Sequence, residues 1–217
     1  QEYFAANNKF GNFTDIVSLS VTLILLFTFA FKYIDDFARS FGFSKPWTAA
    51  IFVVATNLIS DVISIPMSAY KNFVIEEKFG FNKMTVGTFI GDTIKNMLIS
   101  MVLMTVVVAA LAYVYQWLGV NYWIIGSVIL AGIMIFFMTF YTSVILPLFN
   151  KMTPLEDGSL RTAIEEFSNK TGFKISDIYI IDGSKRSTKA NAFFSGLGSR
   201  KRICLYDTLK NKMTDEE

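Results

Sequence analysis

The chain has 217 residues, of which 53% are hydrophobic and 22 are phenylalanine, a composition too apolar for an ordinary soluble domain and typical of a membrane protein. Its formal net charge of +2 offers no basic surface for nucleic acid, so no nucleic-acid partner is expected. The absence of histidine and the single cysteine exclude a disulfide framework and any mechanism that needs a histidine base or ligand within these residues.

The first apolar stretch, residues 16–34, is long enough to cross a bilayer as a helix. A helix rises about 1.5 Å per residue, and the hydrocarbon core is about 30 Å thick. Residues 1–13 are mixed and aromatic, which predicts an interfacial segment leading into this span. Residues 35–46 are polar and predict a short loop, with Pro46 at the start of the second helix.

A second predicted span, residues 48–69, carries polar side chains at helical spacing. Four of them share one helical face: Asn57, Asp61, Ser64 and Ser68. Pro66 is expected to kink the helix near that face. An ionisable residue inside a span is by default a functional-site hypothesis. Two interpretations stay open. In the first, this face lines a wet cavity or packs against a polar partner helix. In the second, Asp61 is a functional site.

The longest polar segment of the membrane half, residues 70–95, is expected to be a cytosolic loop that begins with an amphipathic helix. Gly80 is expected to end that helix. Glu76 and Glu77 are adjacent, so on a helix they point in different directions and do not form an acid–base dyad. We interpret them as part of a solvated face.

No charged residue occurs in residues 96–150, which are long enough for two further spans. A turn is predicted at 119–121, flanked by aromatic residues that suit a membrane interface: Trp117, Tyr122 and Trp123. Residues 1–150 are therefore expected to form a transmembrane region of about four helices. An even number of spans places both ends on one side, and the lysine excess there indicates the cytoplasm.

Charges return in residues 151–217, which predict the start of a small α+β domain on the cytoplasmic side. An amphipathic helix is expected over 155–171, with Gly172 as its end. Three strands are expected: 178–181, 191–195 and 203–206. So few strands give a thin core, and we expect the domain to be incomplete. Thr214 and Glu217 match a capping box, which predicts the start of a further helix.

Residues 182–189 combine a turn at Gly183 with three basic residues: Lys185, Arg186 and Lys189. These side chains either bind an anionic group or lipid headgroup, or they form a solvated turn. The phosphate-loop pattern of glycines followed by lysine and serine is absent, so a nucleotide-binding loop is excluded.

Four segments in order along the chain carry a specific set of motifs: residues 70–85, with Glu-Glu-Lys-Phe-Gly-Phe-Asn-Lys; 148–158, with Leu-Phe-Asn-Lys and Thr-Pro-Leu-Glu-Asp-Gly; 182–194, with Asn-Ala-Phe-Phe; and 203–209, ending in Asp-Thr-Leu. Together they resemble the CaaX prenyl protease 1 family of integral-membrane zinc metalloproteases. Lys189 and Ala190, which precede Asn191, favour a bacterial-like member. The more distant heat-shock membrane proteases share only the Asn-Ala-Phe element and fit less well.

The resemblance implies a polytopic helical membrane region followed by a gluzincin-type protease domain. In this family the next helix carries His-Glu-x-x-His, in which two histidines bind zinc and the glutamate activates water. That motif is absent here. We therefore expect this chain to match the middle of a longer protein, cut at both ends, with no catalytic residue, no metal ligand and no activity of its own.

The resemblance also implies a substrate-binding strand. Asn191, Ala192 and Phe193 match the edge strand that pairs with an extended substrate through backbone hydrogen bonds. The alternative is an ordinary strand with Phe193 or Phe194 in the core. The family's internal chamber gives Asn57, Asp61 and Ser64 of the second span a candidate role as its lining.

The expected function is thus a membrane-embedded zinc endopeptidase that hydrolyses peptide bonds, with prenylated peptides among the candidate substrates. Its partners are the lipid bilayer, zinc, and the remaining C-terminal part, which is either continuous with this chain or separate. A bacterial inner membrane is favoured, or the endoplasmic reticulum membrane for a eukaryotic member, with the protease domain cytoplasmic. The alternative is a non-catalytic transporter, scaffold or pseudoprotease in which Asp61 is an ion or substrate site.

Overall fold

The computed structural model describes residues 1–210, and the predicted capping box at 214–217 lies outside them. The chain divides into two compact units, described separately below. The first comprises Gln1–Phe79 and Val86–Val128. The second comprises Gly80–Thr85 and the residues from Ile129 onward.

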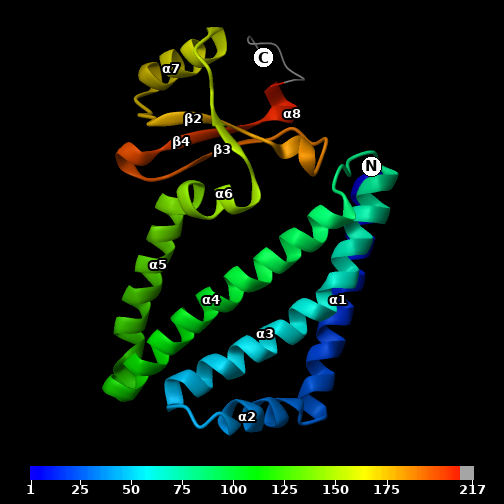
Figure 1. Ribbon diagram of the computed structural model, residues 1–217, viewed down its shortest axis with the longest axis vertical. Coiled ribbons are helices and arrows are strands. Elements are labelled where there is room, and N and C mark those ends of the chain that lie inside the picture. Colours follow the sequence, from blue (N-terminus) through cyan, green and yellow to red (C-terminus); the bar gives the residue numbers. More distant parts are fainter. Residues whose placement is uncertain (211–217) are drawn as a thin grey trace. The chain divides into compact units, whose positions relative to one another are not determined.

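Long helices make up the first unit (Figure 1). They are α1 (Glu2–Phe27), α2 (Ala30–Ser40), α3 (Lys45–Tyr70) with the π-helical η1 (Lys71–Glu76), α4 (Val86–Leu118), the short η2 (Gly119–Asn121), and α5 (Tyr122–Val144), whose second part belongs to the second unit. Three helical segments of the described chain are long and apolar enough to cross a membrane: Glu2–Phe27, Lys45–Glu76 and Val86–Phe149. The third contains α4 and α5, joined at the predicted turn, so all four expected long helices are present.

The start of the first span differs from the prediction. α1 begins at Glu2, so residues 2–13 are helical and the predicted lead-in is part of the first long helix. It ends at Phe27 instead of residue 34, because Phe29 has a φ of 55°, a left-handed conformation that a continuous right-handed helix excludes. The apolar run in the sequence is continuous across this break, which explains why composition alone did not locate it.

The predicted loop over residues 35–46 is also mostly wrong, because α2 covers its first part. Two ion pairs between residues four apart support this helix. Lys32 Nζ lies 2.6 Å from Asp36 Oδ2, and Arg39 Nε lies 2.7 Å from Asp35 Oδ2. Each pair also raises the pKa of its basic member, mainly through the hydrogen bond to the carboxylate.

α3 continues through η1 without interruption, so the predicted loop over 70–95 is much shorter than expected. The helical stretch ends before Gly80, which has a φ of +72°, as the sequence predicted. Pro66 lies inside α3, and the π-helical turns follow it by about one turn. Such turns are a common response to a disturbed ladder of helical hydrogen bonds. Only Gly80–Thr85 separate this helix from α4.

The second unit contains a four-stranded sheet in the order β1-β2-β4-β3 (Figure 1). Its elements are the end of α5, α6 (Leu146–Phe149), β1 (Met152–Pro154), α7 (Ser159–Thr171), β2 (Asp177–Ile181), η3 (Gly183–Lys185), β3 (Ala192–Ser195), η4 (Gly198–Arg200), β4 (Arg202–Tyr206) and α8 (Asp207–Lys210). β2 and β4 are parallel, while β1 and β3 are antiparallel to their neighbours. The fold class expected from the sequence is confirmed: a helical membrane region followed by a small α+β unit.

The core of the sheet is formed by Leu146, Ile181 and Cys204, with Phe193 packed against them. All three predicted strands are present within one residue of their expected bounds. β1 was missed, because it has only three residues and ends in Pro154. α7 begins at Ser159 and not at residue 155, because Leu155 is buried and donates its N–H to Ile178 of β2. Gly172 ends α7 with a φ of +69°, as predicted.

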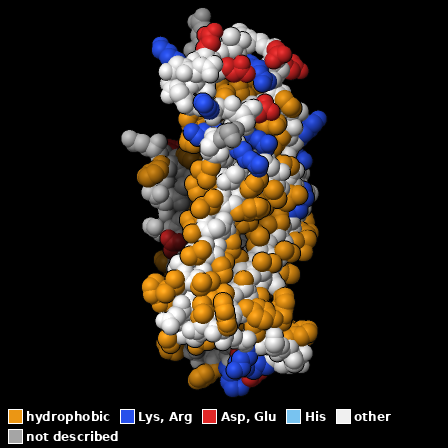
Figure 2. Space-filling view, turned by 90° about the vertical axis from the view of Figure 1, so that its left-hand side faces the viewer, with side chains coloured by type: hydrophobic (Ala, Val, Ile, Leu, Met, Phe, Trp, Pro, Cys, Tyr) orange, Lys and Arg blue, Asp and Glu red, His pale blue; other side chains and the backbone are white. Residues whose placement is uncertain are grey.

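Hydrophobic side chains cover the outer surface of the long helices, as Figure 2 shows. Leu19 on α1, Val106 on α4 and Ile135 on α5 are each more than half exposed. A soluble protein does not expose so much apolar surface, whereas a bilayer accepts it. The surface therefore supports the assignment of these helices to a membrane.

Candidate functional site

β3 is an edge strand whose outer side faces away from the sheet. Tyr206 donates its backbone N–H to the Asn191 carbonyl at 3.0 Å, so these two residues form a hydrogen-bonded pair. Hydrogen-bonded and non-hydrogen-bonded pairs alternate along an antiparallel ladder. Phe193 therefore directs its backbone groups toward β4, while Ala192 and Phe194 direct their N–H and C=O groups toward the open edge. This edge can accept another extended chain.

The three predicted substrate-binding residues occupy different environments on this strand. Asn191 and Ala192 are exposed, and Asn191 Oδ1 accepts the Ala192 N–H at 2.9 Å. Phe193 is half-buried and packs against the core formed by Leu146, Ile181 and Cys204. The geometry gives the first two residues access to a ligand and gives the Phe193 side chain a role in holding the strand.

The segments on both sides of β3 are fixed by hydrogen bonds. Asp207 accepts the Ser184 N–H at 2.8 Å and also accepts the Ser184 hydroxyl. The buried Thr208 hydroxyl donates to the Lys189 carbonyl at 2.8 Å. Gly183 is buried beneath the Tyr206 ring, where a Cβ would come within 2.2 Å of a ring carbon. The predicted turn at Gly183 thus has a packing role.

The three basic residues near this turn have different environments. Arg186 donates to the Phe149 carbonyl at 2.6 Å and to Asn150 Oδ1 at 3.0 Å. Lys189 Nζ lies 4.9 Å from the centre of the Phe81 ring. Lys185 is exposed. The solvated-turn interpretation is therefore wrong for Arg186, whose side chain joins the turn to the segment after α6.

The segment Gly80–Thr85 pairs with the basic turn inside the second unit. Lys83 donates its N–H to the Arg186 carbonyl, Thr188 donates its N–H to the Phe81 carbonyl, and Asn82 forms an antiparallel bridge with Ser187. Two segments about a hundred residues apart are thus joined by an isolated β-bridge and flanking backbone hydrogen bonds. No local pattern in the sequence indicated this pairing, because each partner is short and polar.

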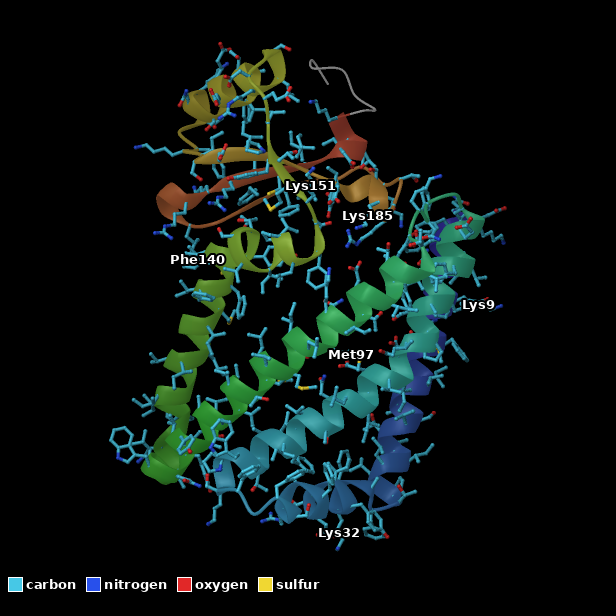
Figure 3. The ribbon with its side chains drawn as sticks, viewed as in Figure 1. Lys9, Lys32, Met97, Phe140, Lys151 and Lys185 are labelled. Carbon is cyan, nitrogen blue, oxygen red and sulfur yellow. The ribbon has the colours of Figure 1, made fainter. Side chains whose placement is uncertain are left out.

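In the first unit, the predicted polar face lies along a groove of about 630 Å³ between α3 and α4. Its polar lining comes from both helices: Asp61, Ser64, Ser68, Thr93, Asn96 and Ser100. Asn57 Nδ2 donates to Asp61 Oδ2 at 3.0 Å and approaches Ser100 Oγ at 3.5 Å. Figure 3 shows Met97 of α4 on the side of this helix that faces α3. The face therefore meets a polar partner helix and also borders a groove.

Glu76 and Glu77 have different environments, as adjacent helical residues should. Glu76 is buried, and its Oε1 accepts the Tyr3 hydroxyl at 2.6 Å. Glu77 is exposed. The interpretation as a solvated face is wrong for Glu76, because α1 covers that side of the helix.

Ionisable groups in the core of the sheet are held in their neutral forms. Burial raises the pKa of the Cys204 thiol to about 11. Burial also raises the pKa of the Tyr206 and Tyr179 phenols, which lie in the same sheet. These groups stay protonated near neutral pH, so the sheet presents no activated nucleophile in them. Among residues 1–210, no three His, Cys, Asp or Glu side chains are grouped as metal ligands.

Comparisons with known proteins agree with this architecture. A family model described as "CAAX prenyl protease N-terminal, five membrane helices" matches residues 1–151, and the model of peptidase family M48 matches residues 154–217. "Probable CAAX prenyl protease 1" of Schizosaccharomyces pombe is 41% identical over 86% of this chain and 40% of its own length. "CAAX prenyl protease 1" of Saccharomyces cerevisiae is 35% identical over 100% of this chain and 50% of its own length.

The fold also matches a solved structure. The crystal structure of S. mikatae Ste24p superposes with a TM-score of 0.92 and 36% sequence identity, over 99% of this chain and 52% of that one. The chain thus spans about half the length of the relatives it matches.

Proposed function

Because the chain belongs to the CAAX prenyl protease 1 family of M48 membrane metallopeptidases, we propose that it supplies the membrane helices and the substrate-binding strand of a zinc-dependent membrane endopeptidase. The observation that carries this proposal is the open edge of β3, where the backbone groups of Ala192 and Phe194 point outward. An extended peptide that pairs there gains backbone hydrogen bonds independent of its side chains.

Asn191 has a specific part in this proposal. Its Oδ1 accepts the Ala192 N–H, so an incoming substrate carbonyl must replace that contact. The displaced amide then turns toward the peptide, where its Nδ2 donates to a second substrate carbonyl. Phe193 anchors the strand during this exchange, because its side chain packs in the core.

The metal must come with residues other than these 217. The sequence contains no histidine, and the described side chains do not fit a zinc ion. Zinc, when bound in the whole protein, supplies the activation of water for hydrolysis. We accordingly propose that residues 1–217 alone are inactive. Elemental analysis of the purified 217-residue chain tests this point, and stoichiometric zinc accompanied by peptidase activity would contradict it.

The substrate class and the cellular membrane are also proposals. The relatives named CAAX prenyl proteases support a prenylated peptide as substrate, with its lipid in the bilayer. These relatives are fungal, which favours the endoplasmic reticulum membrane and gives no support to the bacterial-type member suggested by Lys189 and Ala190. We retain residue 150 as the functional boundary between the membrane region and the peptidase domain, and Asn57, Asp61 and Ser64 as chamber lining.

Two substitutions at Asn191 test the role of the edge strand in the full-length protein. Asn191→Asp keeps an acceptor for the Ala192 N–H but removes the donor, whereas Asn191→Ala removes both. Both are expected to lower kcat/KM for a peptide substrate about tenfold, since each removes a hydrogen bond to substrate. Lys170→Gln on exposed α7 is the matched control. Full activity of Asn191→Asp would contradict direct contact between Asn191 and substrate.

A non-enzymatic membrane transporter or scaffold is the second candidate. The carboxylate of Asp61 beside a groove in a membrane helix favours it, because such residues commonly mark ion or substrate pathways. If peptidase activity of the full-length protein is absent while Asp61→Asn abolishes uptake into vesicles, this second function replaces the first.

A further inference from the structure

A small basic pocket lies in the second unit, between the last turns of α5 and the β3–β4 hairpin. Its volume is about 170 Å³. Six residues line it: Thr139, Phe140, Ser143, Ser176, Arg200 and Arg202. Figure 3 marks Phe140 near the end of α5 that approaches the sheet. The pocket shares no residue with the proposed substrate edge, so its role requires a separate explanation.

Two guanidinium groups are held at this pocket without a carboxylate partner. Arg202 Nη1 donates to Ser143 Oγ at 2.6 Å and lies 5.5 Å from the Tyr179 ring centre. Arg200 lies 5.1 Å from the Phe140 ring centre. Within residues 1–210 neither arginine forms an ion pair. Two positive charges therefore converge on one small space.

The nearest candidate carboxylate, Asp177, is the register partner of Arg202 on β2. Its Oδ1 accepts the Ile178 N–H at 2.9 Å and lies 3.7 Å from Arg161 on α7. Within the described residues Asp177 therefore forms its ion pair with Arg161 and none with Arg202.

The backbone around the pocket is fixed. Gly196 donates its N–H to the Met138 carbonyl at 3.1 Å, which ties the hairpin to α5. Gly196 has a φ of +101°, and a Cβ there would lie 2.1 Å from the Arg200 carbonyl oxygen. Only glycine allows this close approach. The position of Arg200 relative to α5 is thus determined by the hairpin.

The Ser143 hydroxyl in the pocket can donate a hydrogen bond to a ligand. Thr139 donates to the Ile135 carbonyl, and Ser176 donates to the Lys201 carbonyl. The hydroxyl of Ser143 accepts from Arg202 and makes no other bond to the described residues. The pocket therefore offers donors from two arginines and one serine, which is the chemistry that an anionic oxygen ligand requires.

The depth of the pocket in a membrane follows from the length of α5. Tyr122 and Trp123 at the start of this helix suit one membrane interface. From residue 122 to Ser143 an α-helix rises about 31 Å, and the hydrocarbon core is about 30 Å thick. Ser143 and the pocket beside it consequently lie at the level of the lipid headgroups on the opposite side.

We propose that Arg200, Arg202 and Ser143 bind the phosphate group of an anionic phospholipid. Arginine presents paired N–H donors that match phosphate oxygens, and this pair of arginines complements the charge of a phosphomonoester. A volume of about 170 Å³ equals roughly five or six waters at liquid density, which accommodates a phosphate with its ester linkage. The lipid is the expected source, because the site lies at headgroup depth. The proposal does not depend on peptidase activity.

Native mass spectrometry of the full-length protein in detergent provides the test. The protein is titrated with dioctanoyl phosphatidic acid, with dioctanoyl phosphatidylcholine and inorganic phosphate as separate probes. Phosphatidic acid is expected to bind most tightly. The double variant Arg200→Gln/Arg202→Gln should weaken its binding roughly 30-fold. The matched control Lys151→Gln/Lys170→Gln removes the same charge elsewhere and should change it about twofold or less.

Two further variants protect the test from effects on folding. Arg200→Gln alone removes an exposed side chain that makes no hydrogen bond within the described residues, and should weaken binding about fivefold. Arg202→Lys keeps the charge but loses the paired donors, and should give an intermediate loss. Thermal melting of each variant verifies that it is folded.

Three results would overturn the proposal. Equal losses of affinity for phosphatidic acid in the double variant and its control would show that the lipid is attracted to the charged surface in general and not to this pocket. Inorganic phosphate that binds as tightly as phosphatidic acid would identify a soluble phosphate site. Binding of a peptide with a free C-terminal carboxylate could instead require Arg200 and Arg202, while the binding of phosphatidic acid does not. That result would assign the pocket to peptide.

Discussion

The two compact units owe their order to different interactions. In the first unit, α1 has no buried residue, and large apolar side chains cover the outside of the helices. Its polar interactions include the bond from Asn57 to Asp61 within α3. In the second unit, a short sheet with a definite register surrounds Ile181 and Cys204, both completely buried. A bilayer can stabilise the first arrangement, whereas the sheet of the second unit is stabilised by its own packing.

This difference predicts where a single substitution is damaging. A change in the sheet disturbs contacts that hold many neighbours at once, so its effect should be large. A polar change between membrane helices removes one contact while the lipid-facing surface is unaffected, so its effect should be small. The following substitutions test this contrast in the full-length protein, from the largest expected effect to the smallest.

Gly196→Ala should have the largest effect. The added methyl group would overlap the Arg200 carbonyl, and the φ of +101° is strained for any residue with a side chain. We expect a loss of about 3 kcal/mol or more in the free energy of unfolding. Gly198→Ala is the matched control, because its φ is +59° but no atom lies within 4 Å of the added carbon. Its expected loss is about 1 kcal/mol, and equal melting shifts would contradict the packing argument.

The reactivity of Cys204 should report the integrity of the sheet. Its pKa of about 11, against 9.0 for an unperturbed thiol, lowers the thiolate fraction at pH 8 about 100-fold. Alkylation by a maleimide reagent should therefore be slower in the folded protein than in denaturant by at least this factor. Rapid labelling of the folded protein would show that β4 is open to solvent.

The same thiol makes stability depend on pH. Because the folded-state pKa lies above the unfolded value, the neutral thiol contributes its full stabilisation below pH 9, and this is lost as pH rises toward 11. Thermal melting between pH 8 and 11 should show the fall. Cys204→Val should lessen it, while the raised pKa values of Tyr206 and Tyr179 maintain part of it.

Arg186→Gln should destabilise the second unit by about 2 kcal/mol. The substitution removes the hydrogen bonds of Arg186 to Phe149 and Asn150 and leaves the Phe149 carbonyl without that donor. Lys185→Gln changes the neighbouring exposed charge and should alter stability by less than about 0.5 kcal/mol. If the two variants melt alike, the side chain of Arg186 has no structural role.

Asn57→Ala should have the smallest effect, about 0.6 kcal/mol. It removes the bond to Asp61 within α3 and the 3.5 Å contact with Ser100 of α4. Ser60→Ala on the same helix removes only a bond within α3 and serves as the control. A loss for Asn57→Ala that approaches that of Gly196→Ala would contradict the contrast between the two units.

The sequence was sufficient to predict features with strong local patterns. Uninterrupted apolar runs predicted the long helices, and the β-branched and aromatic run before Asp182 predicted β2. Gly80 and Gly172 were correctly expected to end helices. Both have positive φ values in the structure, a backbone conformation that favours glycine. The break at Phe29 could not be predicted, since the apolar run of residues 16–34 continues across it.

Features that depend on distant partners were beyond local patterns. The order β1-β2-β4-β3 requires a parallel pair between β2 and β4, which are separated by twenty residues. The buried state of Glu76 depends on Tyr3, which lies 73 positions away in the sequence. The resemblance of Asn191, Ala192 and Phe193 to an edge strand predicted a binding role, but only the ladder shows which backbone groups face outward.

The binding of an extended peptide along β3 is the central claim, and a structure of the full-length zinc protein with a slowly hydrolysed peptide tests it most directly. The predicted result is a peptide strand beside β3, with backbone hydrogen bonds of about 2.9 Å to Ala192 and Phe194. A peptide bound at another site, with the outer edge of β3 still unpaired, would contradict the claim.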